Sequence, residues 1–156
     1  MKVHQIPIAG DPLLERMAMA FTHRPRPRVT TFGDPFRDLP EPPVADRDTA
    51  LSQSYGVVQG IDFDPGEPAV IVRAAIYYPP GGWMGWHTNS AVPGWRVYVP
   101  VGDIGMMLTT DGPVLDRPGH ANIFHVPAWH AICARGERWS LGVLLPEGHR
   151  LVPTAG

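Results

Sequence analysis

Two histidines in separate apolar segments are the residues of this sequence best suited to bind a metal ion. His87 stands in the run Gly-Trp-His-Thr-Asn, and His130 stands in Trp-His-Ala. Side chains alternate between the two faces of a β-strand, so His87 and Asn89 are expected to point to one side. His130 would join them from a distant strand. Two imidazoles and one oxygen donor leave other positions of an ion open, as in non-haem Fe(II) sites.

A second pair of polar residues follows His130. Arg138 and Ser140 are separated by one residue and therefore share a face of one strand. A guanidinium and a hydroxyl directed at one place suit a planar anionic group such as a carboxylate. The sequence thus predicts a metalloenzyme with an acidic cosubstrate.

The third metal ligand is left open by the sequence. Asn89 offers a neutral carboxamide oxygen, which is a weaker donor to Fe(II) than a carboxylate. Asp103 and Asp111 stand near expected strand ends, and Asp116 stands in an expected turn. Each aspartate can be interpreted as a turn residue or as a carboxylate that approaches the metal.

The composition predicts one soluble domain. A chain of 156 residues is long enough to bury one core, and we expect residues 1–50 to form an N-terminal helix and arm and residues 51–150 to form a β-core. A formal net charge of -2 favours neither a nucleic-acid nor a membrane partner. A small-molecule substrate is therefore expected, and the oligomeric state is open, with a homodimer as one option.

The single cysteine and the N-terminus indicate where the protein works. Cys133 has no partner for an internal disulfide and rules out a thiolate-rich zinc site, which favours a reducing compartment. No apolar run has the length of a signal peptide or of a membrane span. We expect a cytoplasmic protein.

The pattern of apolar runs predicts a mainly β fold. One helix is expected after Asp11, because a capping aspartate, Pro12 and spaced apolar residues follow one another. The proline-rich segment 23–43 is expected to be an extended arm or lid. Short apolar runs separated by turns then indicate eight strands and a jelly roll; these runs are 55–61, 69–78, 84–88, 96–101, 104–110, 121–126, 130–135 and 138–145.

From about residue 77 to residue 145 the sequence resembles the 2-oxoglutarate and Fe(II)-dependent oxygenases with a double-stranded β-helix, in particular the prolyl-hydroxylase-like branch. Tyr-Pro-Pro-Gly-Gly precedes His87-Thr88-Asn89, and Trp129-His130 leads to Arg138-Trp139-Ser140. The family typically has aspartate or glutamate where Asn89 stands. The resemblance implies a dioxygenase, an oxidoreductase that hydroxylates a small or amino-acid-like substrate and releases succinate and carbon dioxide.

The resemblance also implies individual roles. His87 and His130 would be iron ligands, Arg138 would bind the distal carboxylate of 2-oxoglutarate, and Ser140 would support it. Tyr78 and Tyr98 fall where the family places tyrosines that hydrogen-bond this cosubstrate.

Three further residues are candidates for substrate binding. Trp83 and Trp95 flank the strand of His87, where an indole could line a cavity. Arg96 shares parity with Tyr98 and could bind an acidic group of the substrate or form a structural ion pair. Trp86 and Trp129 directly precede the two histidines, so we expect them to face the opposite way, into the core of the sandwich.

Two alternatives to the oxygenase stay open. A cupin-like metalloprotein would use His87, His125 and His130 without 2-oxoglutarate. A catalytically silent binding module would keep the fold and an acid-binding pocket but lack turnover, because Asn89 replaces the ligating carboxylate.

Overall fold

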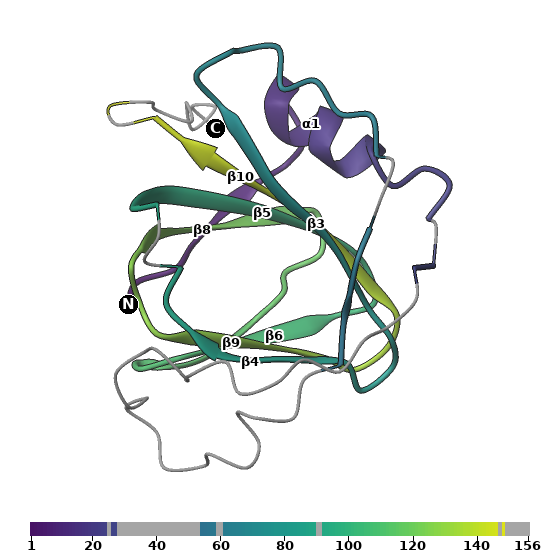
Figure 1. The fold of residues 1–156 in the computed structure, drawn as a ribbon, viewed down its shortest axis with the longest axis vertical. Helices are drawn as coiled ribbons and strands as arrows, with labels where there is room; N and C mark the ends of the chain where they lie inside the picture. The colour runs from purple at the N-terminus through teal and green to yellow at the C-terminus, as the bar shows by residue number, and fades with distance from the viewer. Residues whose placement is uncertain (25, 28–53, 59–60, 90–91, 147, 149–156) are drawn as a thin grey trace.

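Two antiparallel β-sheets that face each other form the body of the protein (Figure 1). The computed structural model describes residues 1–24, 26–27, 54–58, 61–89, 92–146 and 148. The larger sheet contains, in spatial order, β1 (His4–Pro7), β8 (His120–Val126), β5 (Gly94–Gly102), β10 (Arg138–Leu145), β3 (Ile71–Tyr78) and β2 (Gly56–Val57). The smaller sheet contains β4 (Trp83–His87), β9 (His130–Ala134), β6 (Gly105–Thr109) and β7 (Gly112–Leu115).

The strand order is that of a jelly roll. From β3 onward the chain passes between the sheets in such a way that β10 pairs with both β3 and β5, and β9 pairs with both β4 and β6. This arrangement of eight strands is a double-stranded β-helix, the cupin-like fold. The predicted mainly β jelly roll is confirmed.

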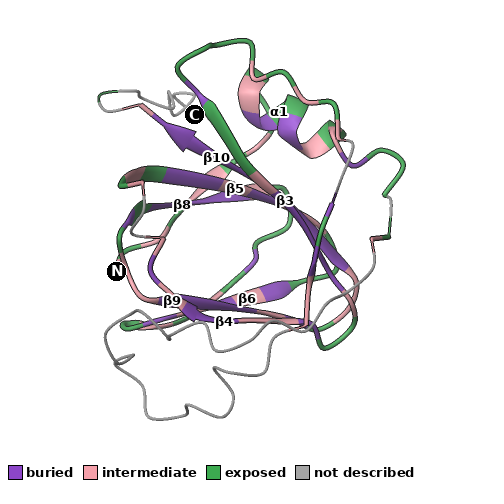
Figure 2. Cartoon of the chain, in the orientation of Figure 1, coloured by how far each residue is buried: buried purple, intermediate pink, exposed green. Residues whose placement is uncertain are grey.

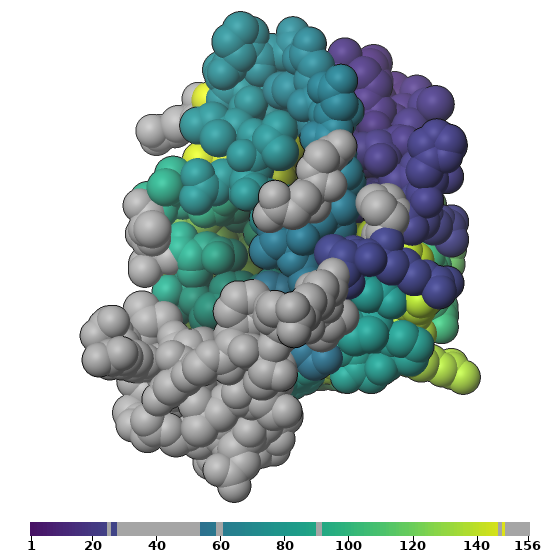
Figure 3. All heavy atoms as spheres, turned by 45° about the vertical axis from the view of Figure 1, so that its right-hand side comes forward, coloured from purple at the N-terminus to yellow at the C-terminus, as the bar shows by residue number. Residues whose placement is uncertain are grey.

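The predicted N-terminal helix is also confirmed, as α1 (Pro12–Met19). The side chain of Asp11 caps it by accepting a hydrogen bond from the Leu14 amide at 3.0 Å. Leu14, Met17 and Phe21 are buried in an apolar cluster with the outer face of the larger sheet. Segment 61–70 lies beside the helix (Figure 3), where the Arg16 guanidinium donates to the carbonyl of Pro65.

Three apolar layers result from this arrangement (Figure 2). One lies between α1 and the larger sheet, and a second lies between the two sheets. The third covers the outer face of the smaller sheet, where Trp86 packs with Ala131, Trp83 and Trp129. The prediction that Trp86 and Trp129 face the core of the sandwich is therefore wrong. They do lie opposite the histidines, but it is the histidines that occupy the interior.

Two strands were not predicted, and one prediction was too long. β1 carries Pro7 at its end, and β7 begins with Gly112-Pro113, which reads as a turn in the sequence. Both strands lie at sheet edges, where a proline removes no ladder hydrogen bond. The predicted strand 55–61 is reduced to the two residues of β2, and residues 59–60 lie outside the described residues.

Most of the predicted arm, residues 28–43, lies outside the described residues, and with it the predicted lid. Within the described ranges, no helix is long and apolar enough to cross a membrane.

Candidate metal and ligand pocket

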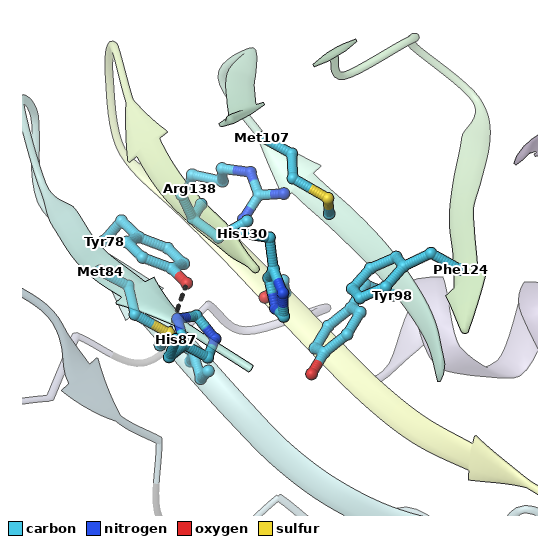
Figure 4. A pocket seen from close by; sticks show the side chains of 11 residues that line it. Tyr78, Met84, His87, Tyr98, Met107, Phe124, His130 and Arg138 are labelled. Atoms are coloured by element: carbon cyan, nitrogen blue, oxygen red, sulfur yellow. Dashed lines mark hydrogen bonds between the residues drawn. The ribbon is translucent and has the colours of Figure 1, made fainter. Parts of the chain in front are cut away.

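A small pocket between the two sheets collects most of the predicted site residues (Figure 4). Its cavity of about 20 Å³ has room for a metal ion or a water molecule, but not for an organic acid in this conformation. The lining residues are Ile76, Tyr78, Met84, His87, Tyr98, Met107, Phe124, His130, Ile132, Arg138 and Ser140.

The two histidines meet in the middle of this pocket. His87 ends β4, His130 begins β9, and the two residues are direct partners across these strands. Their ring centroids are 4.2 Å apart. Figure 4 shows both rings pointing into the pocket, with Tyr78 and Arg138 on one side and Tyr98 and Phe124 on the other. The structure thus brings together the two residues that the sequence singled out.

A β-bulge sets the direction of His87. The register between β4 and β9 shifts between Met84 and His87. Without such a shift, residues three apart in a strand would face opposite sides of the sheet. Met84 and His87 instead both line the pocket, and Trp83 and Trp86 pack on the outer face.

The backbone holds both imidazoles in the same tautomer. Nδ1 of His87 lies 2.7 Å from the Gly85 carbonyl, and Nδ1 of His130 lies 2.6 Å from the Ala128 carbonyl. A carbonyl only accepts, so each Nδ1 carries the proton and donates it. Each neutral ring therefore keeps a lone pair on Nε2. Metal-binding histidines are commonly oriented by such a second hydrogen bond.

Burial keeps these imidazoles uncharged. It lowers the pKa of His87, although the hydrogen bond to Gly85 acts in the opposite direction. Burial also lowers the pKa of His130 well below its ordinary value, and the proximity of His87 adds to this effect. Both rings are therefore neutral at neutral pH, the form that binds a metal.

Asn89 reaches the same point from just beyond β4. Its backbone is left-handed, with φ of 56°, a conformation that asparagine adopts more readily than most residues. Its Nδ2 lies 3.2 Å from Nε2 of His130. The amide donates to the ring nitrogen that carries the lone pair, which agrees with the tautomer assigned above. Asn89 is thus positioned at the histidine pair, as predicted, but its role as a metal ligand stays a prediction.

No carboxylate joins the histidines among the described residues, which contain no cluster of three or more metal-ligating side chains of the types His, Cys, Asp and Glu. Asp103 accepts a hydrogen bond from the Ile104 amide, and Asp111 pairs with the N-terminal ammonium of Met1. Asp116 is engaged elsewhere. The alternative of a carboxylate ligand from these three aspartates is therefore contradicted.

Asp116 forms a buried ion pair with Arg138. Nε and Nη2 of Arg138 lie 2.6 and 3.1 Å from the two carboxylate oxygens. The Gly105 amide and the Asn122 side chain donate to the same carboxylate at 2.8 and 2.9 Å. Burial by itself would raise the pKa of Asp116, but the charge and hydrogen bonds of Arg138 outweigh it and hold this pKa below its usual value. Asp116 is therefore not the turn residue that the sequence suggested.

This ion pair changes the interpretation of Arg138. The arginine does line the pocket, as predicted, but its charge is already balanced within the protein. Binding of an external carboxylate would have to compete with Asp116 or use the remaining N–H groups. A free carboxylate anchor, which the sequence predicted here, is therefore not what the structure shows.

The other predicted cosubstrate residues also line the pocket. Tyr78 is buried beneath the Arg138 guanidinium, whose carbon lies 5.3 Å from the ring centroid, and its hydroxyl faces the sulfur of Met84 at 4.0 Å. Tyr98 stacks on Phe124 with ring centroids 5.7 Å apart. Burial raises the pKa of both tyrosines, so both hydroxyls stay protonated and able to donate. Ser140 lines the pocket beside Arg138.

The predicted substrate residues Trp83 and Trp95 do not line this pocket. Trp83 packs on the outer face of the smaller sheet, where the β4 bulge directs it. Trp95 is 37% exposed on the outer face of the larger sheet and contacts His4 and His125. Neither indole lines this pocket, and a role of Trp83 or Trp95 in substrate binding stays a prediction.

His125 is likewise remote from the two site histidines. It is exposed and packs edge-on against Trp95, with ring centroids 5.3 Å apart. Its neighbour Phe124 lines the pocket, and adjacent residues of a strand face opposite sides. The three-histidine alternative with His87, His125 and His130 is therefore contradicted.

Arg96 is buried on the pocket side of β5, because alternation places it on the same face as Tyr98. Its Nη2 donates to the Val92 carbonyl at 3.0 Å, and its Nε has no hydrogen-bond partner. The alternative interpretation of Arg96 was a structural ion pair, but no carboxylate among the described residues pairs with it. Neither sequence parity nor composition showed that this guanidinium would be unpaired.

The donor set fits a divalent transition metal. Two neutral imidazoles present Nε2 lone pairs at one place, Asn89 lies beside them, and the small cavity has the volume for an ion. His87 and His130 would hold the metal, and Asn89 could turn its amide oxygen to it. Such an ion would supply a Lewis-acidic centre with open positions for small ligands.

Comparisons with known proteins found similarity to solved structures alone. No model of a protein family matches the chain, and no curated protein matches it either. Among solved structures, a cupin domain from Bordetella pertussis Tohama I is similar at 22% identity over 58% of this chain and 94% of that one, with a TM-score of 0.43.

Two further similar structures carry enzyme names. A predicted oxalate decarboxylase from Thermotoga maritima matches at 13% identity over 80% of this chain and 96% of its own, with a TM-score of 0.46. An oxidoreductase of the 2OG-Fe(II) oxygenase family from Burkholderia pseudomallei matches at 17% identity over 51% of this chain and 46% of its own, with a TM-score of 0.37. Likeness at this level does not extend to activity.

Proposed function

We propose that this protein is an Fe(II)-dependent oxygenase that acts on a small molecule or an amino-acid-like substrate. The observation that carries the proposal is the matched orientation of His87 and His130. In both, a backbone carbonyl two residues upstream accepts a hydrogen bond from Nδ1 and so keeps the lone pair on Nε2; in His130 this lone pair accepts a hydrogen bond from Asn89, which a metal would displace. Neutral imidazoles combined with an oxygen donor and open positions suit iron.

The surrounding residues would prepare the site without taking part as metal ligands. Tyr78 and Tyr98 present protonated hydroxyls from opposite sides, and Met84, Met107 and Phe124 give the pocket an apolar lining. A low-dielectric lining strengthens the electrostatic interactions inside the pocket.

2-Oxoglutarate as cosubstrate is the finer part of the proposal. Tyr78, Tyr98, Arg138 and Ser140, to which the resemblance gives this role, all line one pocket. Two observations speak against the usual binding mode, namely the engagement of Arg138 with Asp116 and the small cavity. The cosubstrate would therefore require the pocket to open.

The test is anaerobic titration with Fe(II), followed by 2-oxoglutarate, monitored by visible absorption. Fe(II) binding that is lost in both His87→Ala and His130→Ala is the expected result. A charge-transfer band on addition of 2-oxoglutarate, and succinate release in air, would support this cosubstrate. Fe(II) binding without the band would retain the metal site and exclude 2-oxoglutarate. No Fe(II) binding under any of these conditions would refute the proposal.

A further inference from the structure

The described residues around the pocket provide neutral and cationic groups, but no unpaired negative charge. The imidazoles of His87 and His130 and the carboxamide of Asn89 carry no negative charge, and the carboxylate of Asp116 is balanced by Arg138. A divalent ion would therefore bring two positive charges into a buried site in which the described residues offer no negative charge to offset them. Such a charge is unfavourable unless an anion accompanies it.

Arg96 makes this imbalance larger. Its side chain is 3% exposed, its Nε lacks a hydrogen-bond partner, and its Nη2 contacts only the Val92 carbonyl. In the part of the chain that the structure describes, no carboxylate forms an ion pair with it, in contrast to Arg138. A buried guanidinium with an unused donor is well suited to an anion that arrives from outside.

Arg96 lies beside the metal pocket. Alternation along β5 places it on the same face as Tyr98, which lines the pocket. Arg96 and Phe124 are partners across β5 and β8, and the Phe124 ring contacts His130 at a centroid distance of 4.9 Å. The unpaired arginine and the histidine pair therefore belong to one electrostatic environment.

We infer that the metal ion and a small carboxylate ligand bind this pocket as an interdependent pair, once the pocket opens beyond the volume of about 20 Å³ that it has in this conformation; the ligand supplies the missing negative charge and Arg96 attracts it. This inference rests on the proposed metal site. Coupling of this kind is reciprocal, so the anion raises the affinity for the metal by the same factor as the metal raises the affinity for the anion. The coupling also follows from the neutral side chain at Asn89. Because no carboxylate stands at this position, the ligand supplies the negative charge that a protein carboxylate would otherwise provide.

The coupling is measured with Co(II) as the metal and oxalate as the probe anion. Oxamate is the matched control, because it has nearly the same size but one negative charge less. Co(II) absorption titrations are run at equal free Co(II) concentrations, which corrects for chelation by the anions in solution. We expect oxalate to raise the Co(II) affinity about tenfold or more, and oxamate to raise it less. Equal Co(II) affinity with and without oxalate would overturn the inference but leave the metal site intact.

Variants of Arg96 separate attraction of the anion from a structural role. Arg96→Gln is expected to reduce the oxalate enhancement at least fivefold and, because a positive charge is removed, to raise the affinity for Co(II) alone. Arg96→Lys should retain most of the enhancement. Arg135→Gln, which removes an exposed arginine elsewhere, should change neither value. A decrease of both affinities in Arg96→Gln would assign Arg96 to structure instead, and absence of Co(II) binding with either anion would refute the proposed function itself.

Discussion

The guanidinium of Arg138 and the carboxylate of Asp116 form a two-point ion pair at 2.6 and 3.1 Å, with both side chains buried. The carboxylate also accepts hydrogen bonds from the Gly105 amide and from Asn122. Asn122 in turn accepts one from Gln5 of β1 at 3.0 Å. The network thus connects β10 at the pocket with β6, β8 and the N-terminal strand, and we expect it to contribute to folding more than to ligand binding.

Asp116→Asn should destabilise the protein by about 3–5 kcal/mol, because it leaves the buried charge of Arg138 without its partner. The free energy of unfolding, measured by urea denaturation, checks this value. The double variant Asp116→Leu/Arg138→Met removes both charges and should recover much of the loss. A double variant as unstable as Asp116→Asn would contradict the ion-pair interpretation.

The same pair predicts a dependence of stability on acid pH. The folded pKa of Asp116 is depressed, so its contribution is fully present above the unfolded pKa of about 4. It is lost as the pH falls through the lower folded value. The free energy of unfolding of the native chain should therefore decrease more steeply below about pH 4 than that of the double variant. Parallel pH profiles would show that Asp116 is not stabilised in its charged form.

His87→Ala and His130→Ala should each abolish tight binding of Co(II), since each removes one of the two imidazole donors. His125→Ala is the matched control, because its ring lies on the exposed outer face. Absorption titration of the folded variants measures the effect. Loss of Co(II) binding in His125→Ala would bring back the three-histidine site that the structure contradicts.

The sequence was sufficient to predict the jelly roll and the meeting of the two histidines. Eight of its apolar runs coincide at least in part with strands, because turn residues mark their ends. Parity correctly predicted that Arg96 shares a face with Tyr98 and that Trp86 lies opposite His87, although the side of the sheet assigned to Trp86 was wrong. Such local periodicity is determined by the geometry of the strand itself.

Long-range pairing and local irregularity could not be predicted in this way. The partner of Arg138 is Asp116, an aspartate that follows an unpredicted edge strand and resembles any turn residue. The bulge in β4 reversed the parity of Trp83 relative to His87, and Gly85 inside this strand is a sequence signal that could have indicated the bulge. Arg138 has a carboxylate partner, whereas Arg96 has none among the described residues. Which arginine forms an ion pair depends on contacts between distant strands.

Asn89→Asp should raise the affinity for Fe(II) or Co(II) in the absence of any anion by about tenfold or more, because a carboxylate binds a hard divalent cation more firmly than an amide. Asn89 already lies 3.2 Å from Nε2 of His130, so the new carboxylate would begin close to the ion. Without metal, the added charge is buried beside His130 and should raise the pKa of this imidazole.

Metal titration of the Asn89→Asp variant, with and without oxalate, measures both affinities. The metal affinity of this variant should depend less on oxalate than that of the native chain, because the protein now supplies the negative charge itself. Asn89→Ala is the companion variant and should retain the oxalate dependence, since it removes the amide without adding a charge. If Asn89→Asp gained succinate-forming turnover that the native chain lacks, the natural protein would be a binding module and not an oxygenase. An unchanged metal affinity in Asn89→Asp would show that residue 89 does not reach the metal.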